Sequence, residues 1–261
     1  MQKFDFIRKY ISYRYSSRTK YDVHPPFLFD LITQVFEDMN DYPGYKEVED
    51  LKEKLKKDQG IISINDLGAG SSMNTNLKRS VSYIARTSSK SKRHGRLMYR
   101  LAKYFKPGNI LELGTSLGLS TAYMALGSPG SKIITIEGCQ NISAIAENNF
   151  KQLGIGDIKL ITGSFEDELN SVLGSLHQLD FVFIDGNHKQ EPTIKYFEQC
   201  LSKTVNDSIM IFDDIHWSEG MEKAWEHIKQ HPDVSLSIDI FYMGIVLLKK
   251  ELTKEHFVIR Y

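Results

Sequence analysis

Apolar residues recur at two different spacings along this 261-residue chain, and the spacing changes near residue 109. Before that point the spacing is helical and predicts helices over 3–15, 26–39, 45–57, about 79–87 and 92–105. After that point, short apolar runs rich in β-branched residues alternate with amphipathic stretches. This alternation is typical of strand–helix–strand units with right-handed crossovers and a mostly parallel sheet.

The second half of the chain predicts seven strands. They cover 109–113, 132–137, 157–162, 179–184, 207–213, 235–241 and 243–249. Helices are predicted between them over 119–127, 141–153, 190–203 and 217–230, with a short one near 165–173. Only Tyr242 separates the last two strands, which is too short for a crossover helix, so we expect an antiparallel hairpin there. The fold class is therefore α/β.

Composition and charge favour no particular partner. The chain is 41% hydrophobic and 25% charged, with 33 Lys and Arg against 33 Asp and Glu, as in an ordinary soluble globular protein. The first 20 residues hold no apolar run of signal-peptide length, and no later segment approaches the about 20 apolar residues of a membrane span. We therefore expect a cytoplasmic protein whose Cys139 and Cys200 are reduced, buried thiols.

One segment has a strongly uneven charge. No Asp or Glu occurs from Leu67 to Leu111, whereas ten Lys or Arg residues occur between Lys78 and Lys106. Such a segment can hold an anionic substrate or RNA. Basic residues on surface helices are more often a solvated face, however, and we favour that interpretation.

A glycine-containing turn follows the strand at 109–113. The strand leads through Glu112 into Gly114, Ser116 and Gly118, and a helix follows, so main-chain N–H groups face a polar cofactor. A dinucleotide site has a glycine where Ser116 stands, and here an acid precedes the turn, which weakens that interpretation. The pattern resembles motif I of class I S-adenosylmethionine (SAM) methyltransferases.

A second glycine pair, Gly68 and Gly70, also follows an apolar run. Such folds need a strand that ends in an acid roughly 20 residues further on, and 86–96 has neither strand pattern nor acid. We therefore do not take this pair as the cofactor site.

Residues at the following strand ends complete the cofactor prediction, because ligands bind beyond the carboxyl ends of parallel strands. Glu137 closes the second strand, where a carboxylate accepts hydrogen bonds from ribose hydroxyls. Gly138 and Cys139 follow it and are candidates for the adenine pocket. Ser164 and Phe165 follow the third strand and suit adenine, although Phe165 is equally a candidate for the core.

Three carboxylates, Asp185, Asp213 and Asp214, follow the fourth and fifth strands. Converging carboxylates repel one another unless a cation, a shared proton or a donor compensates, and a hard divalent ion is the natural answer. The segments 183–185 and 212–217 resemble the metal-dependent catechol and caffeoyl-CoA O-methyltransferases. The resemblance implies that Asp185 and Asp213 bind a divalent cation such as Mg²⁺.

Two positions depart from that family. Asp214 stands where the family has Asn, so it is either a third metal ligand or a base or hydrogen-bond acceptor in a metal-free site. His188 stands where the family has a lysine base, and histidine commonly accepts a proton near neutral pH. The stretch around His188 also resembles a bacterial branch of SAM methyltransferases that act on small molecules. The catalytic candidates are therefore His188, Asp185 and Asp214.

The resemblance covers about 92–261 and implies a Rossmann-like methyltransferase domain with a seven-stranded sheet and a C-terminal antiparallel hairpin. Residues 1–91 would be a helical extension or lid over a small hydroxylated acceptor. Asp185 and the turn after Glu112 would hold the methionine end of SAM, and a homodimer is expected. The alternatives are a methyltransferase acting on RNA or protein, a Rossmann oxidoreductase, and a binding module without catalysis. The roles of His24 and His216 stay open at this point.

Overall fold

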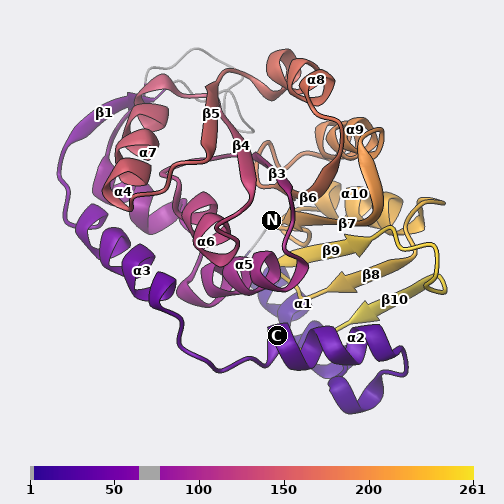
Figure 1. Cartoon of the computed structure of the whole chain (residues 1–261). Helices are drawn as coiled ribbons and strands as arrows, with labels where there is room; N and C mark the ends of the chain where they lie inside the picture. The colour runs from indigo at the N-terminus through magenta and orange to yellow at the C-terminus, as the bar shows by residue number, and fades with distance from the viewer. Residues whose placement is uncertain (1–2, 65–76) are drawn as a thin grey trace. The chain divides into compact units, whose positions relative to one another are not determined.

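The structure, a computed structural model, describes residues 3–64 and 77–261. By contacts the chain divides into two compact units. The central unit is Asp38–Ser175, and the terminal unit combines Met1–Glu37 with Leu176–Tyr261 (Figure 1). This division is based on contacts within the chain. The predicted boundary between 91 and 92 concerns function, because it separates a lid from the methyltransferase domain, and it stays a prediction.

The central unit contains three parallel strands in the order β3-β4-β5, which are β3 (Asn109–Leu113), β4 (Lys132–Glu137) and β5 (Ile158–Thr162). A separate antiparallel pair is formed by β1 (Ile61–Ile64) and β2 (Leu77–Ser80). The helices of this unit are α3 (Pro43–Leu55), α4 (Val81–Thr87), α5 (Lys92–Phe105), α6 (Leu119–Gly127), α7 (Gln140–Gln152) and α8 (Phe165–Ser175).

Apolar residues bury β3 in this unit, as its sequence predicts. Ile110, Leu111 and Leu113 are at most 1% exposed, so burial of their side chains is the main force that holds the strand. Glu112, between them, is fully buried as well. A buried carboxylate needs hydrogen-bond donors around it, so this residue must have a structural or functional partner set.

The terminal unit contains five strands in the order β10-β8-β9-β7-β6. They are β6 (Leu179–Ile184), β7 (Thr204–Asp213), β8 (Leu236–Asp239), β9 (Met243–Leu247) and β10 (Glu255–Val258). β6 and β7 are parallel, and β9 runs antiparallel to both β7 and β8. The predicted C-terminal hairpin is therefore confirmed.

Without the separate pair β1 and β2, the described residues of the two units form eight strands, whereas seven were predicted. The additional strand is β10, which pairs in parallel with β8. Its four residues include only two apolar ones, Phe257 and Val258, so no period-2 pattern long enough for a prediction exists. Its backbone is extended because β8 offers an edge to pair with, which is a tertiary effect.

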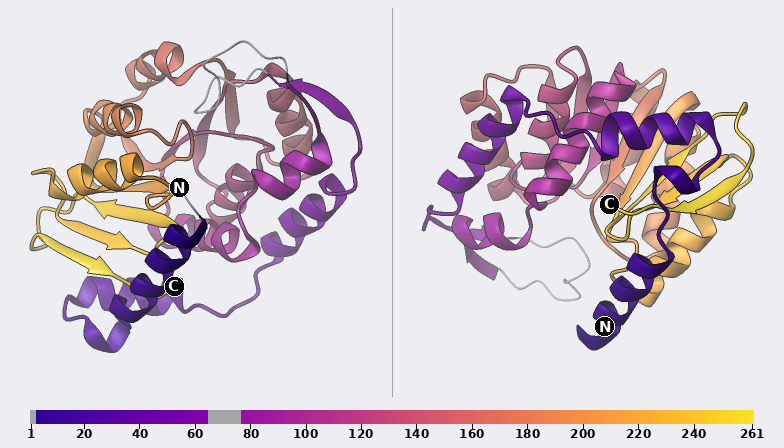
Figure 2. Two further views of the ribbon diagram at one scale, coloured as in Figure 1. Left: turned by 180° about the vertical axis from the view of Figure 1, so that it is seen from behind. Right: turned by 90° about the horizontal axis from the view of Figure 1, so that it is seen from below.

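The helices of the terminal unit are α1 (Lys3–Ser16), a 3₁₀ turn Lys20–Asp22, α2 (Pro26–Leu31), α9 (Gln190–Leu201) and α10 (Glu219–Gln230). The predicted helix 26–39 is shorter than expected: after α2 the chain forms a π-helical turn over Ile32–Phe36. In both views of Figure 2 the indigo helix α1 lies beside the yellow C-terminal strands. Tyr10 and Tyr13 of α1 pack against Phe241, with ring centroids 5.0 and 5.3 Å apart.

Both cysteine side chains are buried, as predicted, and neither forms a disulfide. Burial raises the pKa of the Cys200 thiol to about 12, which keeps it protonated and unreactive at neutral pH. Among the helices that the structure describes, none combines the length and the apolar character needed to cross a membrane.

Candidate functional site

The turn after β3 takes a left-handed backbone at three places. φ is 106° at Gly114, 48° at Ser116 and 77° at Gly118. Glycine adopts a positive φ without steric cost, whereas Ser116 does not. Gly118 is required for a second reason, because a Cβ atom there would lie 2.5 Å from the Phe150 ring. The N–H groups of Gly114 and Thr115 donate to the carbonyl of Ile136 in β4, over 3.0 and 3.2 Å. The turn is thus folded over the end of β4, and α6 begins directly after it.

The buried carboxylate of Glu112 stabilises the segment that contains this turn. Its carboxylate accepts hydrogen bonds from the hydroxyls of Ser120, Thr121 and Thr135, over 2.6, 2.5 and 2.7 Å. These charge-assisted bonds stabilise the buried carboxylate and tie the end of β3 to the first turn of α6 and to β4. Glu112 therefore shapes the cofactor turn, and direct contact between Glu112 and a cofactor stays a prediction.

Glu137, the last residue of β4, holds the turn from its other side. One carboxylate oxygen accepts the N–H of Ser116 over 2.8 Å, and the other accepts the N–H of Cys139 over 2.9 Å. A carboxylate oxygen has two lone pairs and can accept more than one hydrogen bond. The predicted ribose ligand thus lies against the predicted glycine turn, and Gly138 separates it from Cys139.

Ser164 and Phe165 lie at the start of α8. The Ser164 Oγ accepts the N–H of Asp167 over 3.1 Å, which is the geometry of a helix N-cap, and its hydroxyl donates to the Asp167 carboxylate over 2.7 Å. Phe165 is the first residue of the helix and is partly exposed. Ser164 therefore has a structural role, and the adenine contacts of both residues stay predictions.

In the terminal unit, three side chains at the ends of β6 and β7 converge. Asp185, His188 and Asp213 each offer a ligand atom, and these atoms all lie within 4.8 Å of one another. The His188 Nε2 lies 3.7 Å from an Asp185 oxygen, and Asp213 is only 4% exposed. Two carboxylates and an imidazole are a donor set that divalent metal ions accept. Within the part of the chain that the structure describes, this is the one group that meets the geometry of a metal site.

Asp214, predicted either as a third metal ligand or as a base or hydrogen-bond acceptor, is not one of these three residues, and its role stays a prediction. Its backbone N–H donates to the carbonyl of Tyr242 over 2.7 Å, and its own carbonyl accepts the N–H of Trp217 over 2.9 Å. These bonds turn the chain sharply after β7. His188 lies among these ligand atoms, and its predicted role as a base stays a prediction.

Backbone strain marks the same region, and sequence reasoning missed it. Asn187, His188 and Asp214 are non-glycine residues with φ of 66°, 33° and 54°. Residues held in this conformation cost of the order of 1 kcal/mol or more each, and such residues cluster at functional sites. The Asn187 amide donates to the Tyr196 hydroxyl over 3.0 Å, which ties the loop after β6 to α9.

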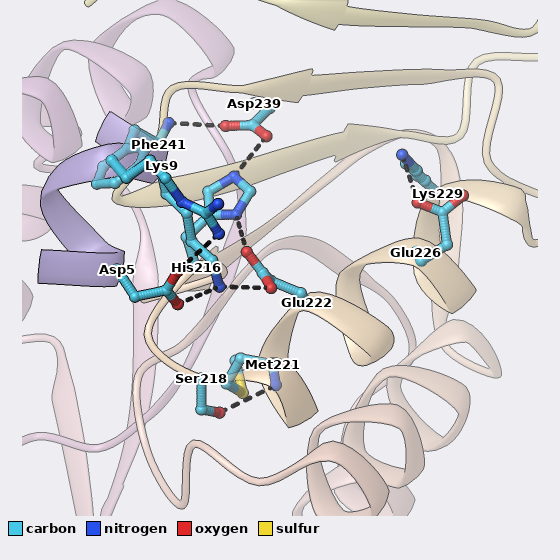
Figure 3. Close-up of polar contacts among 11 residues, drawn as sticks. Asp5, Lys9, His216, Ser218, Met221, Glu222, Glu226, Lys229, Asp239 and Phe241 are labelled. Atoms are coloured by element: carbon cyan, nitrogen blue, oxygen red, sulfur yellow. Dashed lines mark hydrogen bonds and ion pairs between the residues drawn. The ribbon is translucent and has the colours of Figure 1, made fainter. Parts of the chain in front are cut away.

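His216 lies between two carboxylates, and the sequence predicted neither contact. Its Nε2 lies 2.7 Å from Asp239 and its Nδ1 lies 3.1 Å from Glu222 (Figure 3). Burial disfavours the imidazolium charge, but the hydrogen bonds to Asp239 and Glu222 outweigh burial, so the pKa of His216 is raised. No sequence pattern indicates this pairing, because Asp239 lies on a strand 23 residues away.

His24 is exposed and precedes Pro25, the N-cap residue of α2, which agrees with a helix-entry position. The second glycine pair, Gly68 and Gly70, lies outside the described residues.

Many basic side chains of the segment 78–106 contact other residues of the central unit. Lys92 and Arg96 pair with Glu49 of α3 over 2.7 Å each. Several others contact carbonyl groups, a hydroxyl or aromatic rings: Arg79, Arg86, Arg100 and Lys103. These contacts fix α3, α4 and α5 to one another, which gives the segment a structural role.

Known proteins share this architecture. Residues 111–215 match a family described as a methyltransferase domain. A catechol O-methyltransferase of Niastella koreensis is 29% identical over 128 residues, which cover 48% of this chain and 57% of the relative. A catechol O-methyltransferase of Mycobacterium tuberculosis is 25% identical over 127 residues, which cover 48% and 56%. The chain thus spans little more than half the length of these curated relatives.

Solved structures match more of the chain. An O-methyltransferase from Bacillus cereus in complex with SAH has a TM-score of 0.57 at 20% identity, over 85% of this chain and 97% of the other. A Podospora anserina methyltransferase bound to SAH has a TM-score of 0.60 at 17% identity, over 87% and 98%. Similarity at this level of identity concerns the fold, and it confirms the predicted Rossmann-like α/β class. The matched segment 111–215 includes the glycine turn, Glu137 and the three converging ligands. The sequence motif and the family match make this chain similar to the class I SAM-dependent O-methyltransferases, with residues 111–215 matching a methyltransferase domain.

Proposed function

We propose that this protein transfers a methyl group from SAM to a hydroxyl oxygen of a small molecule. The observation that carries the proposal is the hydrogen bond between Glu137 and the Ser116 N–H. It joins the acid that ends β4 to the left-handed turn after β3, and the match to a methyltransferase domain covers both. SAM carries a ribose diol, which the acid at the end of the second strand binds in folds of this type, and Glu137 occupies that position beside the turn.

The same proposal gives Gly138, Ser164 and Phe165 the adenine side of the cofactor. Phe165 is partly exposed at the first position of α8, and Ser164 fixes the start of the helix that carries the ring. Glu112 acts indirectly, because its buried carboxylate holds the hydroxyls of Ser120 and Thr121 at the start of α6.

For the acceptor, we propose that Asp185, His188 and Asp213 hold a divalent cation. The donor set fits such an ion, since its two carboxylates would otherwise repel each other within 4.8 Å. A bound cation would lower the pKa of an acceptor hydroxyl and orient its oxygen. A histidine in the set favours Mn²⁺, Fe²⁺ or Zn²⁺ over Mg²⁺, because imidazole is a softer ligand than oxygen.

The transfer itself is an in-line displacement. The C–O bond forms as the C–S bond breaks, the sulfonium becomes a neutral thioether, and the acceptor hydroxyl gives up its proton. Alignment of oxygen, methyl carbon and sulfur can supply about 7 to 11 kcal/mol of the barrier reduction. In a metal-free site, His188 would take the acceptor proton, with Asp185 orienting its ring across the 3.7 Å between them. Asp214 would then be an additional acceptor.

The acceptor class is proposed from chemistry and from relatives. Two curated relatives are named catechol O-methyltransferases, and a cation held by Asp185 and Asp213 suits two adjacent oxygens. A small-molecule acceptor is favoured over RNA because Lys92, Arg96 and Arg100 have protein partners. A cytoplasmic location and a homodimer belong to the same proposal as expectations.

Cofactor binding is tested by isothermal titration with S-adenosylhomocysteine and, in parallel, with NAD. We expect binding of the first only. Glu137→Ala should weaken it by about tenfold or more, since a lost pair of hydrogen bonds to a diol is worth at least 1.4 kcal/mol. Glu147→Ala, an exposed acid on α7, is the matched control and should leave the affinity unchanged. Unchanged affinity in Glu137→Ala removes the ribose assignment, and binding of NAD alone favours the oxidoreductase.

Metal dependence is tested by chelation. Methyl transfer to a catechol is measured after EDTA treatment and again after titration with Mg²⁺ or Mn²⁺. We expect loss and recovery of activity, and Asp213→Asn should lose activity and Mn²⁺ binding together. Full activity in EDTA would reject the cation and leave His188 as a base that works without a metal.

A further inference from the structure

His216 is the centre of a charged network that joins four elements of the terminal unit (Figure 3). Asp239, at the end of β8, and Glu222, on α10, hold the two ring nitrogens. Glu222 also accepts a hydrogen bond from Lys9 of α1 over 2.8 Å, and Lys9 lies 3.5 Å from Asp5. The charges alternate in sign along this chain of contacts, so each member stabilises its neighbours. The fourth element is the turn after β7, which carries His216 itself.

That turn has a strained geometry that must be held in place. Asp214 has φ of 54°, and its bonds to Tyr242 and Trp217 depend on this angle. Asp213, directly before it, is the buried member of the group of three converging ligands. A left-handed non-glycine residue costs about 1 kcal/mol or more, so contacts elsewhere in the turn must offset that cost. His216 is the side chain of the turn that makes two charge-assisted bonds.

The turn between β8 and β9 is fixed by the same residue. Asp239 uses its second oxygen to accept the N–H of Phe241 over 2.7 Å, and Phe241 has φ of 71°. The Phe241 ring stacks on the His216 ring, with centroids 5.2 Å apart and an interplanar angle of 25°. The next residue, Tyr242, supplies the carbonyl that accepts the Asp214 N–H. The two strained turns are therefore joined both by this backbone hydrogen bond and by the imidazole of His216.

We propose that His216 is a positioning residue for the cation site: held between Asp239 and Glu222, it fixes the turn 214–217 and so the direction in which Asp213 presents its carboxylate. The inference rests on the proposed cation site, but the position of the turn can be measured without it. Helix α1 supports the arrangement from outside through Lys9. Because Lys9 contacts Glu222 and not His216 itself, its share is smaller than that of Glu222.

The test compares His216→Gln, Glu222→Gln and Lys9→Met with Glu226→Gln. Glu226 lies on α10 as well, and its partner is Lys229 over 2.6 Å, outside the network (Figure 3). Glu226→Gln is thus matched in charge change and in helix. Three quantities are measured on the full chain: hydrogen exchange of the 214–217 amides, Mn²⁺ affinity, and S-adenosylhomocysteine affinity. Tyr13→Phe keeps the ring that packs on Phe241 and removes only the hydroxyl bonds to Ile259 and Tyr261, so it separates positioning of the turn 214–217 from general loss of stability.

We expect faster exchange at 214–217 and Mn²⁺ affinity weaker by about tenfold or more in His216→Gln, the usual effect of removing an outer-shell support. Glu222→Gln should do the same more weakly, and Lys9→Met least. S-adenosylhomocysteine affinity should change less than about twofold, and Glu226→Gln and Tyr13→Phe should leave both turn and Mn²⁺ affinity as they are.

Unchanged exchange at 214–217 in His216→Gln overturns the inference, as does faster exchange with unchanged Mn²⁺ affinity. An equal fall of Mn²⁺ affinity in Tyr13→Phe also overturns it, because general destabilisation would then explain the effect. If the wild-type protein binds no Mn²⁺, the proposed cation site fails; faster exchange in His216→Gln then still supports His216 as the residue that fixes this turn.

Discussion

At the scale of single residues, the carboxylates of this protein divide into those that shape a site and those that offer ligand atoms. Glu112 is completely buried and saturated by hydroxyl donors, so its charge fixes the backbone around it. Glu137 accepts backbone N–H groups with both oxygens beside the glycine turn. Asp185 and Asp213 converge with His188. Residue type alone gives no such division; the partners of each carboxylate do.

Gly118→Ala tests the turn after β3. Alanine at φ of 77° is strained, and its Cβ would lie 2.5 Å from the buried Phe150 ring. We expect a loss of about 2 kcal/mol in the free energy of unfolding, together with weaker S-adenosylhomocysteine binding. Urea denaturation and isothermal titration measure the two effects. Gly156→Ala is the control, since a Cβ atom there meets nothing within 4 Å and should change stability by less than about 0.5 kcal/mol. Equal stability of the two variants would contradict the steric argument.

At the scale of elements, local patterns predict regular structure well where apolar spacing decides it. α5 and β3 have the predicted bounds, since Leu97, Met98 and Leu101 on the helix and Ile110 and Leu111 on the strand face one core. The prediction fails for β10, whose extended shape depends on its pairing with β8. It also fails to foresee the left-handed residues after β6 and β7, because contacts remote in sequence hold them.

The candidate site follows the same rule. The glycine turn and Glu137 could be predicted because a strand end, a glycine and an acid are adjacent or at fixed spacing in the chain. The sequence predicts that His188, Asp185 and Asp213 follow the ends of neighbouring strands. It does not predict whether His188 acts as a metal ligand or as a base. The partners of His216 could not be predicted, since Glu222 and Asp239 are ordinary surface-type residues on separate elements.

An acid-sensitive contact lies at the start of α5. Burial, with Lys90 and Arg93 nearby, lowers the pKa of His94 to about 4, and its Nδ1 lies 2.8 Å from the Ser91 hydroxyl at the helix N-cap. At a pH between about 4 and the pKa of 6.5 of an unperturbed histidine, the unfolded chain binds more protons than the folded chain. Stability therefore falls as pH is lowered from about 6.5 towards 4, by about 2 kcal/mol at pH 5.

His94→Gln checks this dependence, because the amide oxygen keeps an acceptor for Ser91 but does not titrate. Urea unfolding at pH 7 and pH 5 should show a smaller loss in the variant than in the wild-type protein. The same loss in both proteins would assign the acid sensitivity to other groups.

At the scale of the whole molecule, residues far apart in sequence share one unit. The terminal unit joins residues 1–37 to 176–261. Arg18 pairs with Ile259, and the Arg18 N–H donates to the Val258 carbonyl over 2.8 Å. The segment predicted as a helical lid is thus divided: α1 and α2 pack with the C-terminal strands, whereas α3 packs in the central unit. A network such as that of His216 can therefore connect α1 to residues more than 200 positions away.

Tyr13 of α1 connects the N-terminal segment to the C-terminal residues of the chain. Its hydroxyl donates to the Ile259 carbonyl over 2.7 Å and accepts the Tyr261 N–H over 2.9 Å, and the side chain is 5% exposed. Tyr13→Phe keeps the ring packed against Phe241 but leaves a buried carbonyl and a buried N–H without this partner. Such losses cost about 1 to 3 kcal/mol, so we expect lower stability and faster exchange of the Tyr261 amide. Tyr15→Phe, on the same helix but 87% exposed, should change neither quantity measurably. If both variants unfold at the same urea concentration, the link between α1 and the C-terminal strands depends on ring packing alone, because the hydroxyl is the only group that Tyr13→Phe removes.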